Sequence, residues 1–89
     1  MNSKELTFGE RVKILLSYMK MSQREFAKET NLNESQLSRL LKGKRKPLYY
    51  EIVSITKVLG IPYDCLVGNS SLFDKLLLTI EEVVASSLW

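Results

Sequence analysis

Four cationic side chains crowd into five positions of the sequence just before Pro47; they are Lys42, Lys44, Arg45 and Lys46. Lys and Arg neutralise phosphate groups, so a run of this kind is suited to holding a nucleic-acid backbone through counterion release. A run of charges by itself is more often only a solvated surface cluster. Its chemistry therefore depends on the elements that carry it.

The side chains needed for catalysis or metal binding are scarce. Histidine is absent, and Cys65 is the single cysteine. Without histidine, neither a conventional zinc site nor a Ser-His or Cys-His nucleophile can be assembled, and no glycine-rich phosphate loop is present. We therefore expect a protein that is not an enzyme and needs no metal or cofactor. A lone cysteine forms no internal disulfide, so we expect Cys65 to be a small buried hydrophobic residue in a reducing compartment.

Length and composition fit one small globular domain, since the 89 residues are 45% apolar and 26% charged. Charge is uneven along the chain: residues 1–70 hold twelve Lys and Arg against seven Asp and Glu, whereas residues 71–89 hold one against three. These two parts are therefore expected to do different jobs. No stretch reaches the roughly 20 apolar residues that span a bilayer, and the N-terminal segment has no continuous apolar run. We expect a soluble cytoplasmic protein with no membrane partner.

Helix signals recur at short intervals along the chain, and the alternation typical of strands is missing. The segments Thr7–Glu10 and Ser22–Glu25 have the capping-box pattern, and Asn33 is suited to cap a third helix. Apolar residues then recur at helical spacing in two groups: Val12, Leu15, Leu16 and Met19; and Leu37, Leu40 and Leu41. In the short helix between them, Phe26 and Ala27 are expected to face inward. Asn31 and Gly43 are suited to the left-handed conformation that ends a helix.

The second half of the chain predicts three more helices. One follows Pro47 and ends at Gly60, a short one spans Tyr63–Val67, and the last runs from Ser71 to about residue 88. The expected fold is therefore all-α, with six helices.

Only three or four residues separate the second predicted helix from the third, which forces them to cross steeply as in a helix-turn-helix. In that motif the second helix lies in the major groove of DNA and the first spans the backbone. The run SQREFAKETNLNESQLSRLLKGKRKP resembles the helix-turn-helix of the lambda-repressor-like (Cro/cI, XRE) family, and the resemblance extends from FGERVKILLSYMKM to VSITKVLGIPYDCLVG, about residues 7–68. It implies a five-helix DNA-binding domain over residues 1–70, with the helix-turn-helix core at 22–41. The sixth helix, at 71–89, lies outside the resemblance and is predicted from its own residues.

The resemblance also implies which residues touch DNA. The base-reading candidates, at the groove-facing start of the recognition helix, are Asn33, Glu34, Ser35, Ser38 and Arg39. The backbone candidates are Ser22, Gln23, Lys42, Lys44, Arg45 and Lys46. Two roles stay open: Arg39 can reach a guanine edge or a phosphate, and Glu34 either accepts from a cytosine amino group or only suits the helix dipole.

Two departures from the family pattern carry predictions. Leu16 and Leu41 replace a buried arginine–glutamate pair of many members, and we expect them to touch, because exchanging a buried ion pair for packed apolar residues is often neutral. Leu48 stands where a hydroxyl residue usually caps the fourth helix, so that helix is expected to begin weakly. Together with Tyr49 and Tyr50, Leu48 is expected to lie partly in the core or to form a dimer contact.

The C-terminal segment, SLFDKLLLTIEEVVASSLW, is more apolar than docking alone requires. Its expected interface residues are Leu72, Phe73, Leu76, Leu77, Ile80, Val83, Val84 and Leu88. On a helix these span an arc of roughly 160°, whereas docking on one domain needs about 100°. We therefore expect a homodimer interface, which would set two recognition helices one turn of DNA apart; docking within the chain is the alternative.

These features predict a sequence-specific regulator of transcription that binds double-stranded DNA, acting as a dimeric repressor on a palindromic operator and associated with the nucleoid when bound. Two other interpretations stay open. An antitoxin would bind a toxin through residues 71–89 and repress its own operon, and an adaptor would bind proteins on a helix-turn-helix scaffold without DNA. Glu34 favours the adaptor because phosphates repel a carboxylate, whereas the basic run argues against it.

Overall fold

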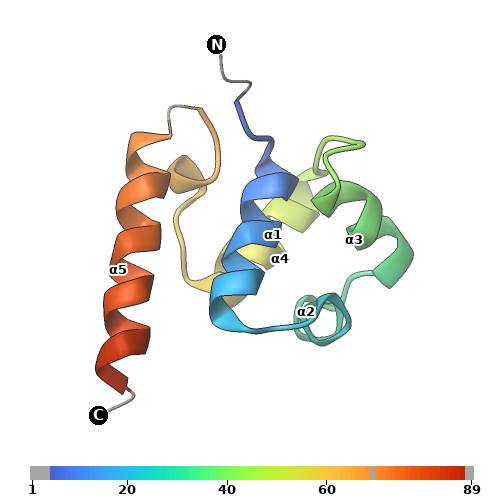
Figure 1. Cartoon of the computed structure of the whole chain (residues 1–89). Helices are drawn as coiled ribbons and strands as arrows, with labels where there is room; N and C mark the ends of the chain where they lie inside the picture. The colour runs from blue at the N-terminus through green and yellow to red at the C-terminus, as the bar shows by residue number, and fades with distance from the viewer. Residues whose placement is uncertain (1–4, 69, 88–89) are drawn as a thin grey trace.

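The computed structural model of the chain describes residues 5–68 and 70–87. Within them the chain forms five α-helices, one 3-10 helix and no strand, so the expected all-α class is confirmed for this part of the chain. The elements, in chain order, are α1 (Phe8–Met19), α2 (Gln23–Thr30), α3 (Glu34–Leu41), α4 (Tyr49–Leu59), the 3-10 helix η1 (Tyr63–Cys65) and α5 (Ser71–Ser87) (Figure 1).

The short helix expected over Tyr63–Val67 is only one 3-10 turn, so the expected sixth helix is the fifth α-helix, α5. Hydrogen bonds in this turn run from an N–H to the C=O three positions earlier, as in that helix type. Gly68 then adopts a φ of 67°, which turns the chain toward α5. The few residues between Pro62 and Gly68 leave no room for an α-helix to propagate.

Capping boxes start α1 and α2, as the sequence predicted. Thr7 N–H donates to the Glu10 carboxylate at 2.9 Å, and Thr7 Oγ1 accepts from Glu10 N–H at 3.1 Å. Ser22 and Glu25 make the same two bonds at 2.9 and 3.0 Å. Asn31 ends α2 with a φ of 59°, also as predicted. Local signals therefore fix the start of both helices.

One core of buried apolar side chains draws on all five α-helices of the described residues. Its members are Phe8, Val12, Leu15, Leu16, Phe26, Ala27, Leu37, Leu40, Leu41, Ile55, Ile61, Leu66 and Phe73. Leu16 and Leu41 both belong to it, which fits the loss of an ion pair at these two positions; their direct contact stays a prediction.

The helix α3 lies directly against α1 because Gly9 has no side chain. A methyl group on Gly9 would overlap the carbonyl group of Leu40 in α3. Backbones can approach this closely only where a Cβ atom is missing. The apolar side of α3 thus faces the core, and its polar side is left at the surface.

The helix α5 stands beside α1, on the side of α1 away from α3 (Figure 1). Phe73, near its start, is 1% exposed and belongs to the core. The expectation that Phe73 forms an interface with another protein is therefore wrong, because docking of α5 on α1 and η1 already buries this large side chain. Three half-buried residues of the following turns pack against the same core: Leu76, Leu77 and Ile80. The other described candidates are exposed, namely Leu72, Val83 and Val84, while Leu88 lies outside the described residues.

Arg11 is fully buried beneath α5, a feature that the sequence analysis did not anticipate. Its guanidinium carbon lies 5.4 Å from the centroid of the Phe73 ring, and Nη2 donates to the Gly68 carbonyl. Nε and Nη1 have no hydrogen-bond partner among the described residues. Cation–π contact and one hydrogen bond therefore tie α1 to α5 and to the link before it.

The start of α4 is more exposed than expected. Leu48, Tyr49 and Tyr50 all lie at the surface, with Tyr49 81% exposed, so their expected partial burial is wrong. The buried side of α4 carries Glu51 and Ile55 instead. Cys65 is only half-buried, at the edge of the core. None of the described helices is both long and apolar enough to cross a membrane.

Candidate nucleic-acid interface

The turn between α2 and α3 is held from inside the molecule. Three residues, Asn31–Asn33, separate the two helices. The Thr30 hydroxyl donates to the Phe26 carbonyl at 2.7 Å, and Ser54 of α4 donates to the Thr30 carbonyl at 2.7 Å. The end of α2 is therefore fixed by α4 as well as by its own cap.

The start of α3 presents polar side chains to solvent. Asn33 Oδ1 accepts from the Gln36 N–H at 3.0 Å, so this residue caps the helix. Among the base-reading candidates, Asn33, Glu34, Ser35 and Arg39 are exposed and Ser38 is half-buried. Ser35 and Arg39 are one helical turn apart, which puts them on the same face. The predicted set thus lies together on the accessible side of α3.

The start of α2 is an organised helix N-terminus. The Ser22 hydroxyl oxygen accepts from Glu25 N–H, and the Glu25 carboxylate accepts from Ser22 N–H. Hydrogen bonding of this carboxylate to Ser22, chiefly to its backbone N–H, holds the pKa of Glu25 below its usual value. Ser22 is therefore already engaged in capping, while Gln23 is half-buried at the first helical position. Free N–H groups in the first turn attract anions.

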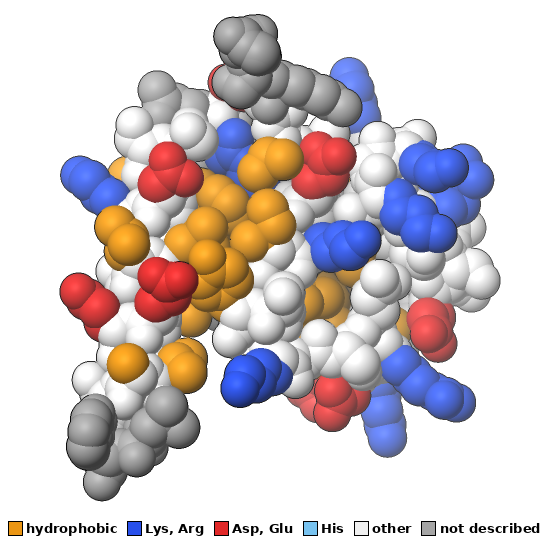
Figure 2. Space-filling view, in the orientation of Figure 1, with side chains coloured by type: hydrophobic (Ala, Val, Ile, Leu, Met, Phe, Trp, Pro, Cys, Tyr) orange, Lys and Arg blue, Asp and Glu red, His pale blue; other side chains and the backbone are white. Residues whose placement is uncertain are grey.

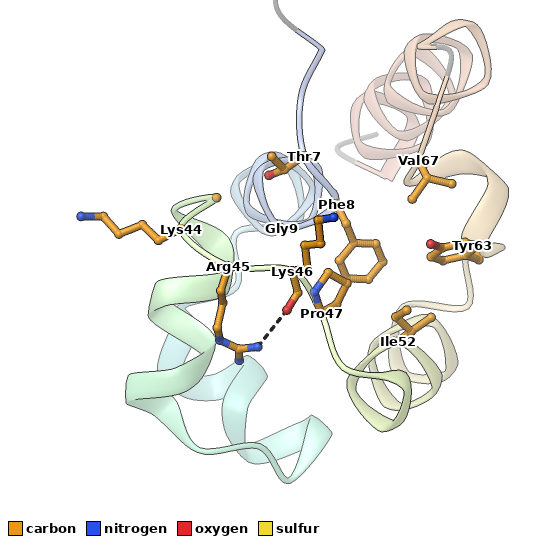
Figure 3. Close-up of a pocket in the computed structure, with 11 residues that line it drawn as sticks. Thr7, Phe8, Gly9, Lys44, Arg45, Lys46, Pro47, Ile52, Tyr63 and Val67 are labelled. Atoms are coloured by element: carbon orange, nitrogen blue, oxygen red, sulfur yellow. Dashed lines mark hydrogen bonds between the residues drawn. The ribbon is translucent and has the colours of Figure 1, made fainter.

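Three lysines of the basic run reach solvent. Lys42, Lys44 and Lys46 are all exposed. Lys44 extends away from the body of the protein, whereas Lys46 lies over a shallow hollow of about 580 Å³ beside Phe8 and Pro47 (Figure 3). Figure 2 shows Lys and Arg side chains gathered on the side of the molecule that carries α2 and α3, and apolar side chains gathered between α5 and α1. The basic side is thus separate from α5.

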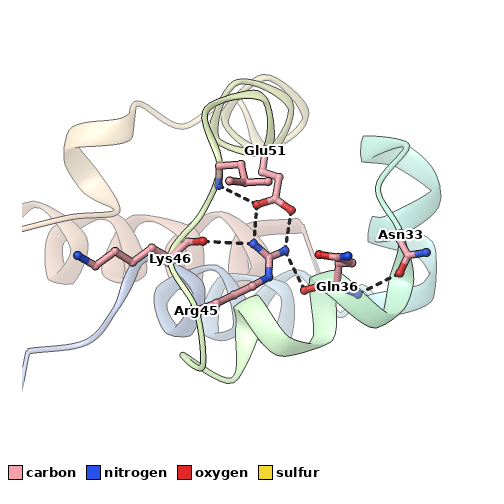
Figure 4. A network of polar contacts seen from close by, with 6 residues as sticks. Asn33, Gln36, Arg45, Lys46 and Glu51 are labelled. Atoms are coloured by element: carbon pink, nitrogen blue, oxygen red, sulfur yellow. Dashed lines mark hydrogen bonds and ion pairs between the residues drawn. The ribbon is translucent and has the colours of Figure 1, made fainter.

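Arg45 differs from the three lysines with which the sequence grouped it. Its Nη1 and Nη2 donate to the two carboxylate oxygens of Glu51 at 2.9 and 2.6 Å. Nη1 also donates to the Lys46 carbonyl at 3.2 Å, and Nη2 to the Gln36 carbonyl at 3.0 Å (Figure 4). Hydrogen bonding to Arg45 lowers the pKa of Glu51, and the same bonds raise the pKa of Arg45. This guanidinium points into the protein.

Glu51 is the site residue that sequence reasoning missed. It is 2% exposed, and besides Arg45 it accepts from the Leu48 N–H at 2.8 Å. Glutamate at the third position of α4 fits the carboxylate half of a capping box, a signal present in the sequence. The Leu48 side chain has no polar atom with which to cap α4, and the bond from Leu48 N–H to Glu51 stabilises the start of this helix instead. Pairing with Arg45 across the loop has no comparable local signal.

Comparison with known proteins agrees with this geometry. A helix-turn-helix family model matches residues 19–64, more than half of the chain, from the end of α1 into η1. The chain belongs to the XRE (Cro/cI-like) helix-turn-helix family of DNA-binding domains, as its sequence predicted. No curated protein and no solved structure matches it significantly. The matched residues include α2, α3, the basic loop and α4, which are the elements that build the candidate interface.

Proposed function

We propose that this protein is a sequence-specific regulator of transcription that binds double-stranded DNA by inserting α3 into the major groove. The observation that carries the proposal is the solvent-facing polar side of α3 next to three exposed lysines, in a chain of the XRE family. Polar side chains at the start of a recognition helix read base edges, and lysines beside it neutralise phosphates.

The proposed contacts fall into two sets. Base-reading residues are those on the exposed side of α3: Asn33, Glu34, Ser35, Ser38 and Arg39. Backbone contacts come from the N-terminus of α2, including Ser22 and Gln23, and from Lys42, Lys44 and Lys46. Arg45 is left out of the second set because its side chain is paired with Glu51.

A dimeric repressor on a palindromic operator is the form of this function that we favour. Val83 and Val84 line an apolar groove of about 340 Å³ between α5 and the ends of α1 and α4. A second copy of the chain would cover this groove without touching α3. The half-sites of such an operator lie one turn of DNA apart, about 34 Å, and the two recognition helices of the dimer would enter successive major grooves.

Selection from a pool of random duplex DNA tests the proposal. Enrichment of a two-fold-symmetric site, with binding that weakens as salt rises, is the expected result. Recovery of no preferred sequence at any salt concentration would contradict sequence-specific regulation.

The same apolar groove supports a second candidate function, that of an antitoxin whose toxin docks on α5 while α3 binds the operator. A single, unpaired half-site in the selection, together with a monomeric protein in solution, would favour this candidate over the homodimer.

A further inference from the structure

We infer that Arg45 and Glu51 form a positioning clamp for the DNA interface, which holds the basic loop and α4 against α3 and makes no phosphate contact itself. The inference rests on the proposed function and concerns how its interface is held in shape. Glu51, a buried carboxylate, would thereby support the binding of a polyanion.

The clamp joins three parts of the interface. Arg45 donates to the Gln36 carbonyl in α3, to the Lys46 carbonyl in the loop and to both carboxylate oxygens of Glu51 in α4. Glu51 in turn accepts a hydrogen bond from the backbone N–H of Leu48, the N-cap residue of α4. Only the planar fork of arginine can make these bonds at once, since lysine offers one compact ammonium group.

Every donor of Arg45 is either paired within the protein or buried away from a phosphate. A guanidinium carries five N–H groups. Each Nη nitrogen of Arg45 makes two hydrogen bonds, and Nε is buried without a partner among the described residues. The Arg45 side chain is 18% exposed and that of Glu51 only 3%. Lys44 and Lys46, on either side, are exposed and point elsewhere (Figure 3).

Two consequences separate a clamp from a phosphate contact. Arg45→Lys keeps the charge but loses the planar fork of donors. If Arg45 is a clamp, this substitution weakens DNA binding; if it were a simple phosphate contact, the affinity for DNA would be retained. Glu51→Gln removes a negative charge from the interface, so simple electrostatics predicts tighter DNA binding. A clamp predicts weaker binding instead, because the loop and α4 lose their tie to α3.

The experiment measures the DNA affinity of Arg45→Lys, Glu51→Gln and the control Lys44→Gln across a salt series, on the duplex enriched by the wild-type chain. We expect a roughly tenfold loss for the first two with an unchanged salt slope, since charge-assisted hydrogen bonds are lost but no phosphate contact is. For Lys44→Gln the slope should fall by about 0.9, the value for one phosphate contact. Wild-type affinity in Arg45→Lys, or tighter binding by Glu51→Gln, would overturn the clamp.

A double variant distinguishes weaker DNA binding caused by loss of the clamp from weaker binding caused by unfolding. Arg45→Met with Glu51→Leu removes both charges at once, which leaves no unpaired buried charge and no change in net charge. It should melt near the wild-type temperature yet bind DNA as weakly as Glu51→Gln. Wild-type affinity in this folded variant would overturn the clamp while leaving the proposed function intact. Failure of the wild-type chain to bind any duplex would overturn the proposed function and the clamp with it.

Discussion

Gly9, the second residue of α1, lets the backbone of α3 pack directly against it. In the middle of a helix, Gly→Ala ordinarily stabilises by up to about 1 kcal/mol. Here the added methyl group would overlap the Leu40 carbonyl, a backbone group that cannot rotate away. We expect Gly9→Ala to lower the free energy of unfolding by about 3 kcal/mol or more, measured by urea denaturation.

Gly60→Ala is the matched control. Gly60 has open space around it but a φ of 68°, so only backbone strain opposes the methyl group, about 1 kcal/mol. A Gly9→Ala variant as stable as Gly60→Ala would contradict the close approach of α1 to α3.

Glu51 gives stability a defined dependence on pH. Hydrogen bonding to Arg45 lowers the pKa of Glu51 in the folded state, so the unfolded chain binds protons first as the pH falls. The contribution of Glu51 is complete at neutral pH and is lost as the pH falls below the usual glutamate range through the folded pKa. The stability difference between wild type and Glu51→Gln should therefore shrink in acid, as measured by denaturation at several pH values. A difference that is constant with pH would contradict this.

Asn33 caps the start of α3 and is also a proposed base-reading residue, and two substitutions separate these two roles. Asn33→Asp keeps an oxygen for the Gln36 N–H, so stability should stay within about 0.5 kcal/mol of wild type, whereas Asn33→Ala should lose about 1 kcal/mol. For DNA affinity we expect the reverse order, because the aspartate adds a charge that phosphates repel. If Asn33→Ala bound DNA more weakly than Asn33→Asp, Asn33 would act only as a cap.

Helix positions could be predicted because their signals are local. The pairs Thr7–Glu10 and Ser22–Glu25 each lie within one turn, and both capping boxes are present as expected. The short helix expected at Tyr63–Val67 begins at Tyr63 as predicted, but it is a 3-10 turn that already ends at Cys65, before Gly68 turns the chain with a φ of 67°.

Partners distant in sequence escaped prediction. Spacing along α5 placed Phe73 on its apolar face, yet could not tell burial on α1 from burial on another protein. Arg45 joined a basic run by composition, whereas its orientation depends on Glu51, six residues away, and on Gln36 in another helix. These contacts arise only when the elements pack against one another. For that reason the two candidates whose roles changed, Phe73 and Arg45, are residues whose partners lie on other elements.

At the scale of the whole molecule, the proposed homodimer depends on the groove beside α5. Val83 and Leu78 are equally exposed, at 62% and 61%, but only Val83 lines the groove. If a second copy covers the groove, Val83→Glu should shift the protein from dimer to monomer in sedimentation, because burying an unpaired carboxylate is unfavourable. Leu78→Glu, the matched control, should remain dimeric. Equal behaviour of the two variants would contradict a dimer through this groove.

The DNA-binding face itself is tested most directly by titrating isotope-labelled protein with the enriched duplex and following its backbone amide signals. We expect the largest shifts at the start of α2, along α3 and in the loop at residues 42–46, with the C-terminal half of α5 unaffected by the DNA itself. Shifts confined to α5, or no shifts at all, would contradict the central claim that α3 and the lysines of the following loop form the DNA-binding surface.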